Sequence, residues 1–592
     1  MLIAFLAYSH LRTATIGAAR RHLLDLASEH SHRVAEVTFG DWCVLVVGGH
    51  QATAQLRLQA MGRPNEIAFR VGQASDHDDD RFLAVTLQPT SIQVQTDYAG
   101  SVPAFYSLEP SFVMSNIEPC IPLADGLGAS DLDLENVYGF LRFGHYIWDE
   151  TAWKGAFQCL PDCIFKFRQG SNDAEHRYLA SIQATQERST ATDKEVADAF
   201  YELNRHLVGQ SLSNANSIIL PLSSGYDSRL ILAAVAENPH LRERLSCFTY
   251  GDRYSIEVLA AEELAKATQT RWTWADLPAR FLELSYLDRI GRVFGSSLHM
   301  HGMYQIEFYE FIRKAQQSKT PLTLTSGFMS GVPAGQHISL LAISAEGDSL
   351  VRAMNNFSQS NIWSKKELDT LDCFRGNTDH LENLAEERFR RAFQRFDGSV
   401  AQRSVMFDVW TRQRAFISYH PRTFEWLTHV RSPHMNPDYA NFFMSLRDEH
   451  LHDRRAVELM LMRRYPQLAS IRSNSNRRVG LAGPISYAGT VLAKMADRLG
   501  MRGVMPTRFR DDAFDLDSQA VRNCHSEALY PFNGESVVQS AVEQVVGNDG
   551  FLGQLVGAAL GGSSQAYQRL VGWQALAFDI QIAQTGRSDA KR

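Results

Sequence analysis

The second part of the chain alternates short apolar runs with amphipathic segments. Residues 217–220 form an apolar run of the length that buried strands have, and residues 230–236 favour a helix. Residues 245–252 predict a second strand that ends in a turn, residues 255–266 a second helix, and residues 271–274 a third strand. This order predicts a doubly wound parallel sheet, in which ligands bind at the carboxyl ends of the strands.

The first part of the chain shows the shorter runs that are typical of a β-rich domain. Strand-like segments occupy residues 34–39, 42–47, 82–87 and 92–97. The apolar residues 1–8 lack the basic stretch of a secretory leader, so they favour a further strand. We therefore expect strands to dominate this part of the molecule.

A polar stretch at residues 170–194 separates the two patterns and predicts a connection between domains. A chain of 592 residues is longer than one core usually supports, so at least two domains are expected. We place the first domain at residues 1–170 and the second at residues 195–592, where helices surround the parallel sheet. The fold class that follows is α/β.

Charge and composition limit the function classes. A net charge of −7 leaves no basic footprint for nucleic acid. No apolar run approaches the roughly 18–20 residues that a membrane helix needs, so membrane insertion is not expected. The seven cysteines are dispersed and odd in number, which favours reduced thiols and a cytoplasmic location.

The loop that follows residues 217–220 carries the most informative chemistry. Residues 223–225 and Ser228 are serines and a glycine at the start of a helix, where backbone N–H groups and hydroxyls can bind an anion. Asp227 beside them could hold a divalent cation that neutralises phosphate charge. The loop has no lysine, so it is not the GxxxxGK[ST] phosphate loop. The plain alternative is an ordinary serine-rich turn between a strand and a helix.

This loop resembles the SGGxDS pyrophosphate loop of the N-type ATP pyrophosphatases, which cut ATP between its α and β phosphates. With the strands and helices around it, it is similar to the synthetase domain of class B asparagine synthetases, β-lactam synthetase and lasso-peptide macrocyclases. The resemblance implies ATP and Mg²⁺ as cofactors, with Asp227 as a catalytic residue and magnesium ligand. The residues that it places around the nucleotide and pyrophosphate are Ser223, Ser224, Gly225, Tyr226, Ser228, Tyr250, Glu257, Ser326 and Gly327. For Glu257, an exposed position on its helix is the alternative.

The first domain carries a related resemblance. Residues 97–106 and 113–116 are similar to the glutamine amidotransferase domain of this family, which is Ntn-hydrolase-like, and residues between 131 and 145 resemble its closing helix. Glutamine-using members expose a cysteine as the first residue after Met removal, and its own amine acts as the base. Here Leu2 takes that position, and the first cysteine is Cys43 in a strand. The resemblance therefore implies a degenerate domain that does not hydrolyse glutamine.

Residues 144–151 also hold three side chains that catalysis often uses, namely His145, Asp149 and Glu150. Aromatic residues stand on both sides of them. We therefore favour a packed turn over a catalytic role for this group.

The chain departs from the family pattern in its second pyrophosphate segment. Residues 322–336 form a β-run and a glycine-rich turn, with Ser326 and Gly327 matching residues that line the adenylate. Relatives carry an aspartate, the second magnesium ligand, where this chain has Gly331. Where relatives have a catalytic glutamate or tyrosine this chain has Phe328, which cannot transfer a proton.

A third departure concerns the cation that neutralises the leaving group. Relatives place a lysine after a segment similar to residues 432–436, but this chain has no lysine between residues 432 and 493. Arg477 and Arg478, together with Arg472, are the cationic candidates for catalysis. A plain surface position is an equally open alternative for these arginines.

The sequence supports two hypotheses of different classes. The first is an ATP-dependent, AMP-forming ligase that adenylates a substrate carboxylate and joins it to an amine. Its substrate would be a peptide, as in a lasso-peptide macrocyclase, or a natural-product or polysaccharide precursor. The second is a catalytically degenerate partner protein, suggested by the changes at Phe328 and Gly331. A third chemistry, thiolation of an RNA base, is disfavoured because the basic surface for RNA is not evident. A protein partner or a homo-oligomer stays open.

Overall fold

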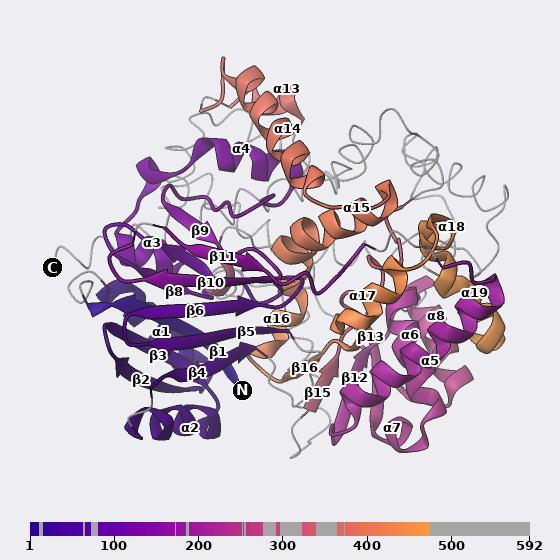
Figure 1. Ribbon diagram of the computed structural model, residues 1–592. Coiled ribbons are helices and arrows are strands. Elements are labelled where there is room, and N and C mark those ends of the chain that lie inside the picture. Colours follow the sequence, from indigo (N-terminus) through magenta and orange to yellow (C-terminus); the bar gives the residue numbers. More distant parts are fainter. Residues whose placement is uncertain are drawn as a thin grey trace.

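The computed structural model describes residues 1–10, 16–62, 65–72, 81–171, 173–184, 189–250, 253, 256–275, 292–295, 322–338, 364–371 and 373–473. These residues form a mixed α/β structure with two sheets, which lie on opposite sides of Figure 1. The first sheet is large and mostly antiparallel, and the second is smaller and parallel. Among the described helices, none combines the length and the apolar character that crossing a membrane requires.

The first sheet has the path β11-β10-β6-β5-β4-β1-β8-β7-β9, and β3 joins β1 to β2. Its strands are β1 (Leu2–Ser9), β2 (Arg33–Phe39), β3 (Trp42–Gly48), β4 (Ile67–Gly72), β5 (Phe82–Gln88), β6 (Ser91–Thr96), β7 (Phe105–Ser107), β8 (Val113–Ser115), β9 (Ala156–Gln158), β10 (Cys163–Arg168) and β11 (Glu175–Tyr178). The strands predicted at residues 34–39, 42–47, 82–87 and 92–97 are confirmed, as is the strand at the start of the chain.

Strand β1 is buried along its whole length because both of its faces are covered. Leu6 and Tyr8 belong to one apolar cluster, whereas Phe5 and Ala7 belong to another. Side chains of a strand alternate between its two faces, so from Ala4 onward each cluster takes every second residue. The helices of this region are α1 (Gly17–Glu29), α2 (His50–Met61), α3 (Cys120–Asp125) and α4 (Leu134–Phe143).

Strand β11 is a correction to the sequence reading. Residues 170–194 look polar enough for a connection, but within them β11 pairs with β10 through four residue pairs, from Cys163 with Tyr178 to Lys166 with Glu175. Its side chains are mostly exposed, which removes the alternation that would mark a strand. The first sheet therefore extends to Tyr178, and helix α5 begins at Asp193.

The second sheet is parallel throughout, with the strand order β14-β13-β12-β15-β16. Its strands are β12 (Ser217–Pro221), β13 (Leu245–Tyr250), β14 (Arg271–Ala275), β15 (Leu322–Thr325) and β16 (His429–Arg431). The helices between and beside them are α5 (Asp193–Leu212), α6 (Tyr226–Glu237), α7 (Pro239–Arg244) and α8 (Ile256–Thr268). The order reverses beside β12, so a crevice for ligands is expected where β12 and β15 end.

The rest of the described chain is helical and lies over and between the sheets (Figure 1). It comprises the short helix Ala129–Asp131, α13 (Lys365–Leu368), α14 (Thr378–Gln394), α15 (Val400–Asp408), a π-helix (Val409–Ile417), α16 (Tyr419–Glu425), a 3₁₀ turn (Pro433–Met435), α17 (Pro437–Met444), α18 (Asp448–Leu451), a 3₁₀ turn (His452–Arg454), α19 (Arg455–Arg464) and α20 (Pro466–Ala469). Helix α19 packs along α5, beside the parallel sheet.

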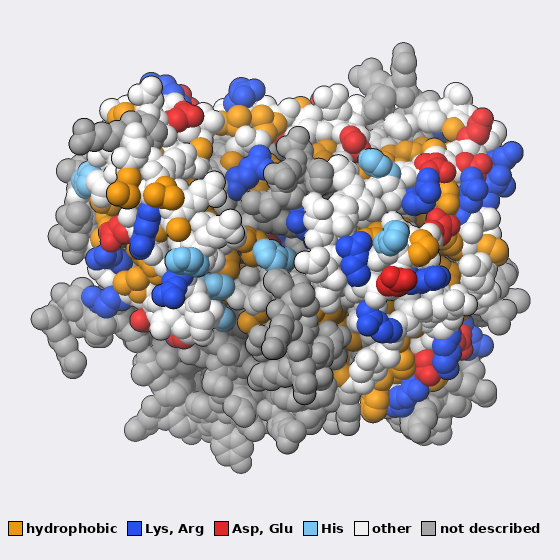
Figure 2. Space-filling model, turned by 90° about the horizontal axis from the view of Figure 1, so that it is seen from below, with side chains coloured by type: hydrophobic (Ala, Val, Ile, Leu, Met, Phe, Trp, Pro, Cys, Tyr) orange, Lys and Arg blue, Asp and Glu red, His pale blue; other side chains and the backbone are white. Residues whose placement is uncertain are grey.

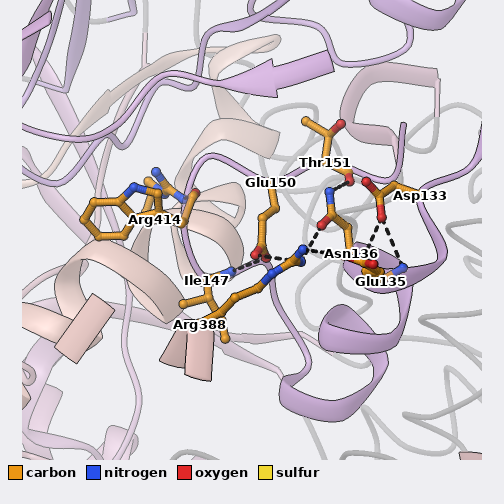
Figure 3. Close-up of polar contacts among 9 residues, drawn as sticks. Asp133, Glu135, Asn136, Ile147, Glu150, Thr151, Arg388 and Arg414 are labelled. Atoms are coloured by element: carbon orange, nitrogen blue, oxygen red, sulfur yellow. Dashed lines mark hydrogen bonds and ion pairs between the residues drawn. The ribbon is translucent and has the colours of Figure 1, made fainter. Parts of the chain in front are cut away.

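Arginines from this helical part bind the turn at residues 144–151, as Figure 3 shows. Arg388 of α14 lies 3.2 Å from a carboxylate oxygen of Glu150 and donates to the Asn136 side chain at 2.6 Å. Burial raises the pKa of Glu150, and the charge of Arg388 opposes that rise. His145 is 3% exposed. The packed turn predicted for this group is therefore confirmed.

A second contact of this kind comes from the π-helix. Arg414 donates to the backbone oxygens of Trp148 and Cys159. A Cβ at Gly100 would stand only 3.0 Å from Arg414 Cδ, so the two chain segments are closely packed. Burial lowers the pKa of Arg414 to about 10. Arg388 and the buried Arg414 thus hold this helical part against the region of the first sheet.

Candidate functional site

The site expected from the sequence lies where β12 and β15 end, next to the reversal of strand order. Leu222 continues the strand by donating to Phe248 O at 2.8 Å, and the chain then turns through residues 223–225 into α6. Thr249 Oγ1 donates to Leu222 O at 2.7 Å, which fixes the turn against β13. The neighbouring parallel strands therefore determine where this loop begins.

The loop is held by its own serines. Ser223 N donates to Ser228 Oγ at 3.0 Å, and Gly225 N donates to Ser223 Oγ at 3.1 Å. Ser224 N donates to Glu257 Oε2 of helix α8. The backbone N–H groups that were expected to face an anion are thus paired within the protein.

Helix α6 supplies other donors for an anion. Gly225 precedes the helix in an extended conformation, and no side chain caps the helix. The first N–H groups of a helix have no acceptor inside the helix, and its dipole favours negative charge at that end. The first turn of α6, at the carboxyl end of β12, is therefore the natural place for a phosphate group.

Glu257 supports the loop from helix α8. Its side chain is 8% exposed, so the alternative of an exposed helical glutamate is wrong. Burial raises the pKa of Glu257, while its hydrogen bond from Ser224 and the charge of Arg229 act in the opposite direction. Its role in the structure is to hold the loop through Ser224.

Arg229 braces the same loop from the helix side. It is fully buried and donates to Ser224 O at 2.7 Å, to Leu468 O at 2.9 Å and to Ile471 O at 3.0 Å. Burial lowers its pKa to about 10. The guanidinium group, with its five donors, therefore links the loop to the chain that follows α20.

The second segment turns directly over the first. Ser326 N donates to Arg431 O at 2.8 Å, so the segment leaves the sheet beside β16. A Cβ at Gly327 would lie 2.7 Å from the Cβ of Asp227, a distance that real side chains do not adopt. Glycine at this position lets the two segments approach, and the structure thereby brings Ser326 and Gly327 next to the start of α6.

Asp227 stands in the first turn of α6 with an unpaired oxygen. Its Oδ1 is buried and has no hydrogen-bond partner among the described residues. Burial raises the pKa of Asp227, while the electrostatic effects of Arg454 and His337 act in the opposite direction. Burying a carboxylate without a donor is costly, and a bound cation would remove that cost. Ser224, which is fully buried, likewise has an unpaired Oγ in the described structure.

Arg454 is a cation of this site that sequence reasoning missed. Its guanidinium carbon lies 4.5 Å from the centre of the Tyr226 ring, over the first residue of α6. Asp453 and Arg454 both have the left-handed backbone that non-glycine residues rarely adopt, with φ of 47° and 61°. This irregular turn places Arg454, and no spacing rule in the sequence marks it.

Comparison with known proteins adds little to this geometry. No family model matches the chain, and no curated protein matches it. Solved structures that match include a glutamine phosphoribosylpyrophosphate (PRPP) amidotransferase from B. subtilis, complexed with ADP and GMP, and an allosteric regulatory enzyme of purine biosynthesis.

Both matches are remote. Each has 10% identity and covers 46% of this chain, with TM-scores of 0.17 and 0.18. The matched region spans 65% of the first protein, less than two thirds of its length, and 80% of the second. Similarity this low does not establish a relationship, so the function has to be inferred from the site itself.

The phenylalanine at position 328 lies in a defined environment. The Phe328 side chain is buried, with its ring 5.8 Å from the guanidinium carbon of Arg81. His337, nine residues further on, has its Nδ1 2.5 Å from the buried carboxylate of Asp408. A buried carboxylate that orients an imidazole is an arrangement that acid–base chemistry uses. His337 thus stands directly after the second segment, with its ring held by Asp408.

Some of the remaining predicted residues belong to the described part of the chain and others do not. Tyr226 begins α6 and donates from its hydroxyl to Glu458 at 2.8 Å, whereas Tyr250 ends β13 on the same edge of the sheet. Arg477 and Arg478 lie outside the described residues, and the backbone oxygen of Arg472 accepts a hydrogen bond from Arg229.

Proposed function

We propose that this protein is an ATP-dependent ligase that forms an amide bond through an acyl-adenylate. The observation that carries the proposal is Asp227: a buried carboxylate oxygen without a donor, in the first turn of an uncapped helix, beside the reversal of strand order. A carboxylate there would repel a phosphate unless a divalent cation lay between them. A nucleotide that binds together with its metal would give the Asp227 oxygen a cation and the first turn of the helix an anion.

Magnesium fits this donor set. It prefers oxygen ligands and usually binds one or two carboxylates together with phosphate oxygens and water. Asp227 offers such an oxygen, free of competing donors in the described structure. When bound, the ion would offset the negative charge of the phosphates. The chain's own groups would then position the nucleotide, with Ser326 and Gly327 beside it.

In the proposed reaction, a carboxylate oxygen of the substrate attacks the α-phosphate of ATP, and the bond to pyrophosphate breaks. An amine then attacks the acyl carbon, the bond to AMP breaks with its electron pair on AMP, and the amine nitrogen releases a proton to solvent as the amide forms. The first turn of α6 and Arg454 would hold the pyrophosphate, because both present positive charge at the end of β12. Glu257 would act by holding the loop.

We further propose that the substrate brings its own amine. Residues 1–170 would then be a degenerate amidotransferase-like domain, and residues 195–592 the synthetase domain. A peptide, or a natural-product or polysaccharide precursor with a free carboxylate, is the substrate class that fits. On the face that Figure 2 shows, basic side chains are interspersed with acidic and apolar ones.

A non-catalytic partner protein is the second candidate. The buried Phe328 favours it, since this position cannot supply the proton transfer of a glutamate or tyrosine. Under this function the site would bind no nucleotide, or would bind it without turnover to AMP and pyrophosphate.

Calorimetric titration with Mg²⁺ and a non-hydrolysable ATP analogue tests the proposal. We expect magnesium-dependent binding to the wild-type protein. Asp227→Asn should weaken it on the order of 100-fold, as the loss of a charged contact worth about 3 kcal/mol predicts. Circular dichroism should remain unchanged, because the side chain contributes little to packing.

The matched control is Asp438→Asn, which changes an exposed first-turn aspartate of α17. This variant should bind like the wild type. Equal binding by Asp227→Asn and the wild type would refute the nucleotide site, and binding without AMP formation from any carboxylate substrate would favour the partner function.

A further inference from the structure

The absence of a side chain at position 331 leaves a space next to Asp227. A Cβ built on Gly331 would stand 3.2 Å from Asp227 Oδ1. A side chain at this position would therefore begin beside the unpaired carboxylate oxygen.

That space is filled by another residue of the same turn. The side-chain oxygen of Gln336, Oε1, lies 1.9 Å from the point where the Cβ of Gly331 would be. Its Cδ lies 3.0 Å from that point. An aspartate or alanine at position 331 would collide with this amide, so glycine is what allows Gln336 to occupy the space beside Asp227.

The turn is built to return Gln336 to this place. Gln336 N donates to Gly331 O at 3.0 Å, which closes the turn. Gly335 has φ of +85°, and a Cβ there would lie 1.4 Å from Leu451 O. Only a glycine fits between α18 and the turn when the backbone at position 335 is left-handed. The two glycines therefore work together to bring the amide oxygen of Gln336 beside Asp227.

The two oxygens near position 331 are both hydrogen-bond acceptors. Asp227 Oδ1 and Gln336 Oε1 each lie within 3.2 Å of one point, and the carboxylate oxygen has no donor among the described residues. Two acceptor oxygens that converge repel each other unless a cation or a proton lies between them. Carboxylate and amide oxygens are both ligands of hard divalent cations.

We propose that Gln336 is the second protein ligand of the magnesium ion, in place of the carboxylate that Gly331 does not supply. This inference rests on the proposed nucleotide site, which provides the first ligand, Asp227. The amide oxygen is neutral, so the protein brings one negative charge to the metal instead of two. The metal should consequently bind weakly by itself and much more tightly together with the phosphates of the nucleotide.

The test measures metal affinity, without any substrate. Mn²⁺ replaces Mg²⁺, and its bound fraction is followed by electron paramagnetic resonance with and without the non-hydrolysable ATP analogue. Gln336→Ala should weaken Mn²⁺ binding in the presence of the analogue about tenfold. Gln336→Glu should tighten Mn²⁺ binding in the absence of nucleotide by a similar factor, because it restores a second carboxylate.

The matched control is Gln394→Ala, at an exposed position at the end of α14, which should leave Mn²⁺ affinity unchanged. A purely structural role of Gln336 would not make the glutamate variant bind Mn²⁺ more tightly, so that gain is the decisive result. Unchanged Mn²⁺ affinity in both Gln336 variants would overturn this inference alone, provided that Asp227→Asn still loses binding. If Asp227→Asn also bound Mn²⁺ and the analogue like the wild type, the proposed function itself would fail.

Discussion

Single residues set the shape of the second segment, and Gly335 is the clearest case. Its left-handed backbone and its contact with Leu451 O leave no room for a side chain. Gly126, which ends α3, is also left-handed, with φ of +65°, but nothing lies within 4 Å of the Cβ that it lacks. A comparison of the two glycines therefore separates the free-energy cost of a left-handed backbone from the cost of a steric clash.

We expect Gly335→Ala to destabilise the protein by clearly more than Gly126→Ala. The left-handed backbone alone costs an alanine about 1–2 kcal/mol, and only Gly335→Ala adds displacement of the Leu451 carbonyl. Urea unfolding of both variants, with nucleotide binding measured beside it, checks this. Equal losses of unfolding free energy would show that the turn yields to the new side chain.

Elements meet around a histidine that sequence reasoning did not single out. His434, in the 3₁₀ turn after β16, has its Nε2 2.8 Å from Asn204 Oδ1 of α5 and its Nδ1 2.6 Å from Ser330 Oγ. Tyr439 donates to Ser330 O at 2.8 Å from helix α17. Ser330 Oγ itself donates to Gly327 O at 2.6 Å, and through these contacts the His434 ring connects three elements behind the second segment.

This connection should make stability depend on pH. Burial lowers the pKa of His434 to about 3 from the usual 6.5, so the unfolded chain binds a proton that the folded chain does not. Stability should fall as the pH decreases from 6.5 towards 3. The contribution of this residue is about 1.4 kcal/mol per pH unit within that range.

His434→Gln should reduce that slope by about one proton. Urea unfolding between pH 5 and 7 gives the slope for both proteins. Burial also lowers the pKa of His22 and His145 to about 4, so part of the dependence will remain. An unchanged slope in the variant would mean that His434 titrates equally in the folded and unfolded chains.

At the scale of the whole molecule, a buried ion pair joins the first sheet to helix α16, which packs against β16 of the second sheet. Arg81, which directly precedes β5, is fully buried, and its Nη1 lies 2.7 Å from Glu425 Oε1 at the end of α16. Its Nε and Nη2 have no hydrogen-bond partner among the described residues. Removing one member of such a pair leaves the other charge buried and uncompensated.

We therefore expect Arg81→Ala to lower the free energy of unfolding by about 3–5 kcal/mol. Arg168→Ala is the matched control, because its pair with Glu175 is more than half exposed on both sides and should matter by less than about 1 kcal/mol. Replacing both partners, by Arg81→Met with Glu425→Leu, should recover most of the loss. Urea unfolding measures all three, and a small effect of Arg81→Ala would indicate that solvent reaches Glu425.

The sequence by itself determined the local structure. Apolar spacing predicted β12, α6, β13, α8 and β14 in their correct order, because strand and helix periods depend on near neighbours. It also singled out residues 223–228 and Asp227, because serines, a glycine and a carboxylate at the start of a helix can bind a phosphate and its cation. The exposed strand β11 was not predicted, because buried and exposed side chains do not alternate along it.

Only the tertiary structure decided which distant residues share the site. Glu257 meets Ser224, Arg454 lies over Tyr226, and Gln336 fills the space at Gly331. These contacts follow from the order of parallel strands and from left-handed turns. Neither leaves a periodic signal in the chain, because backbone conformation and strand order are settled by packing across the whole core.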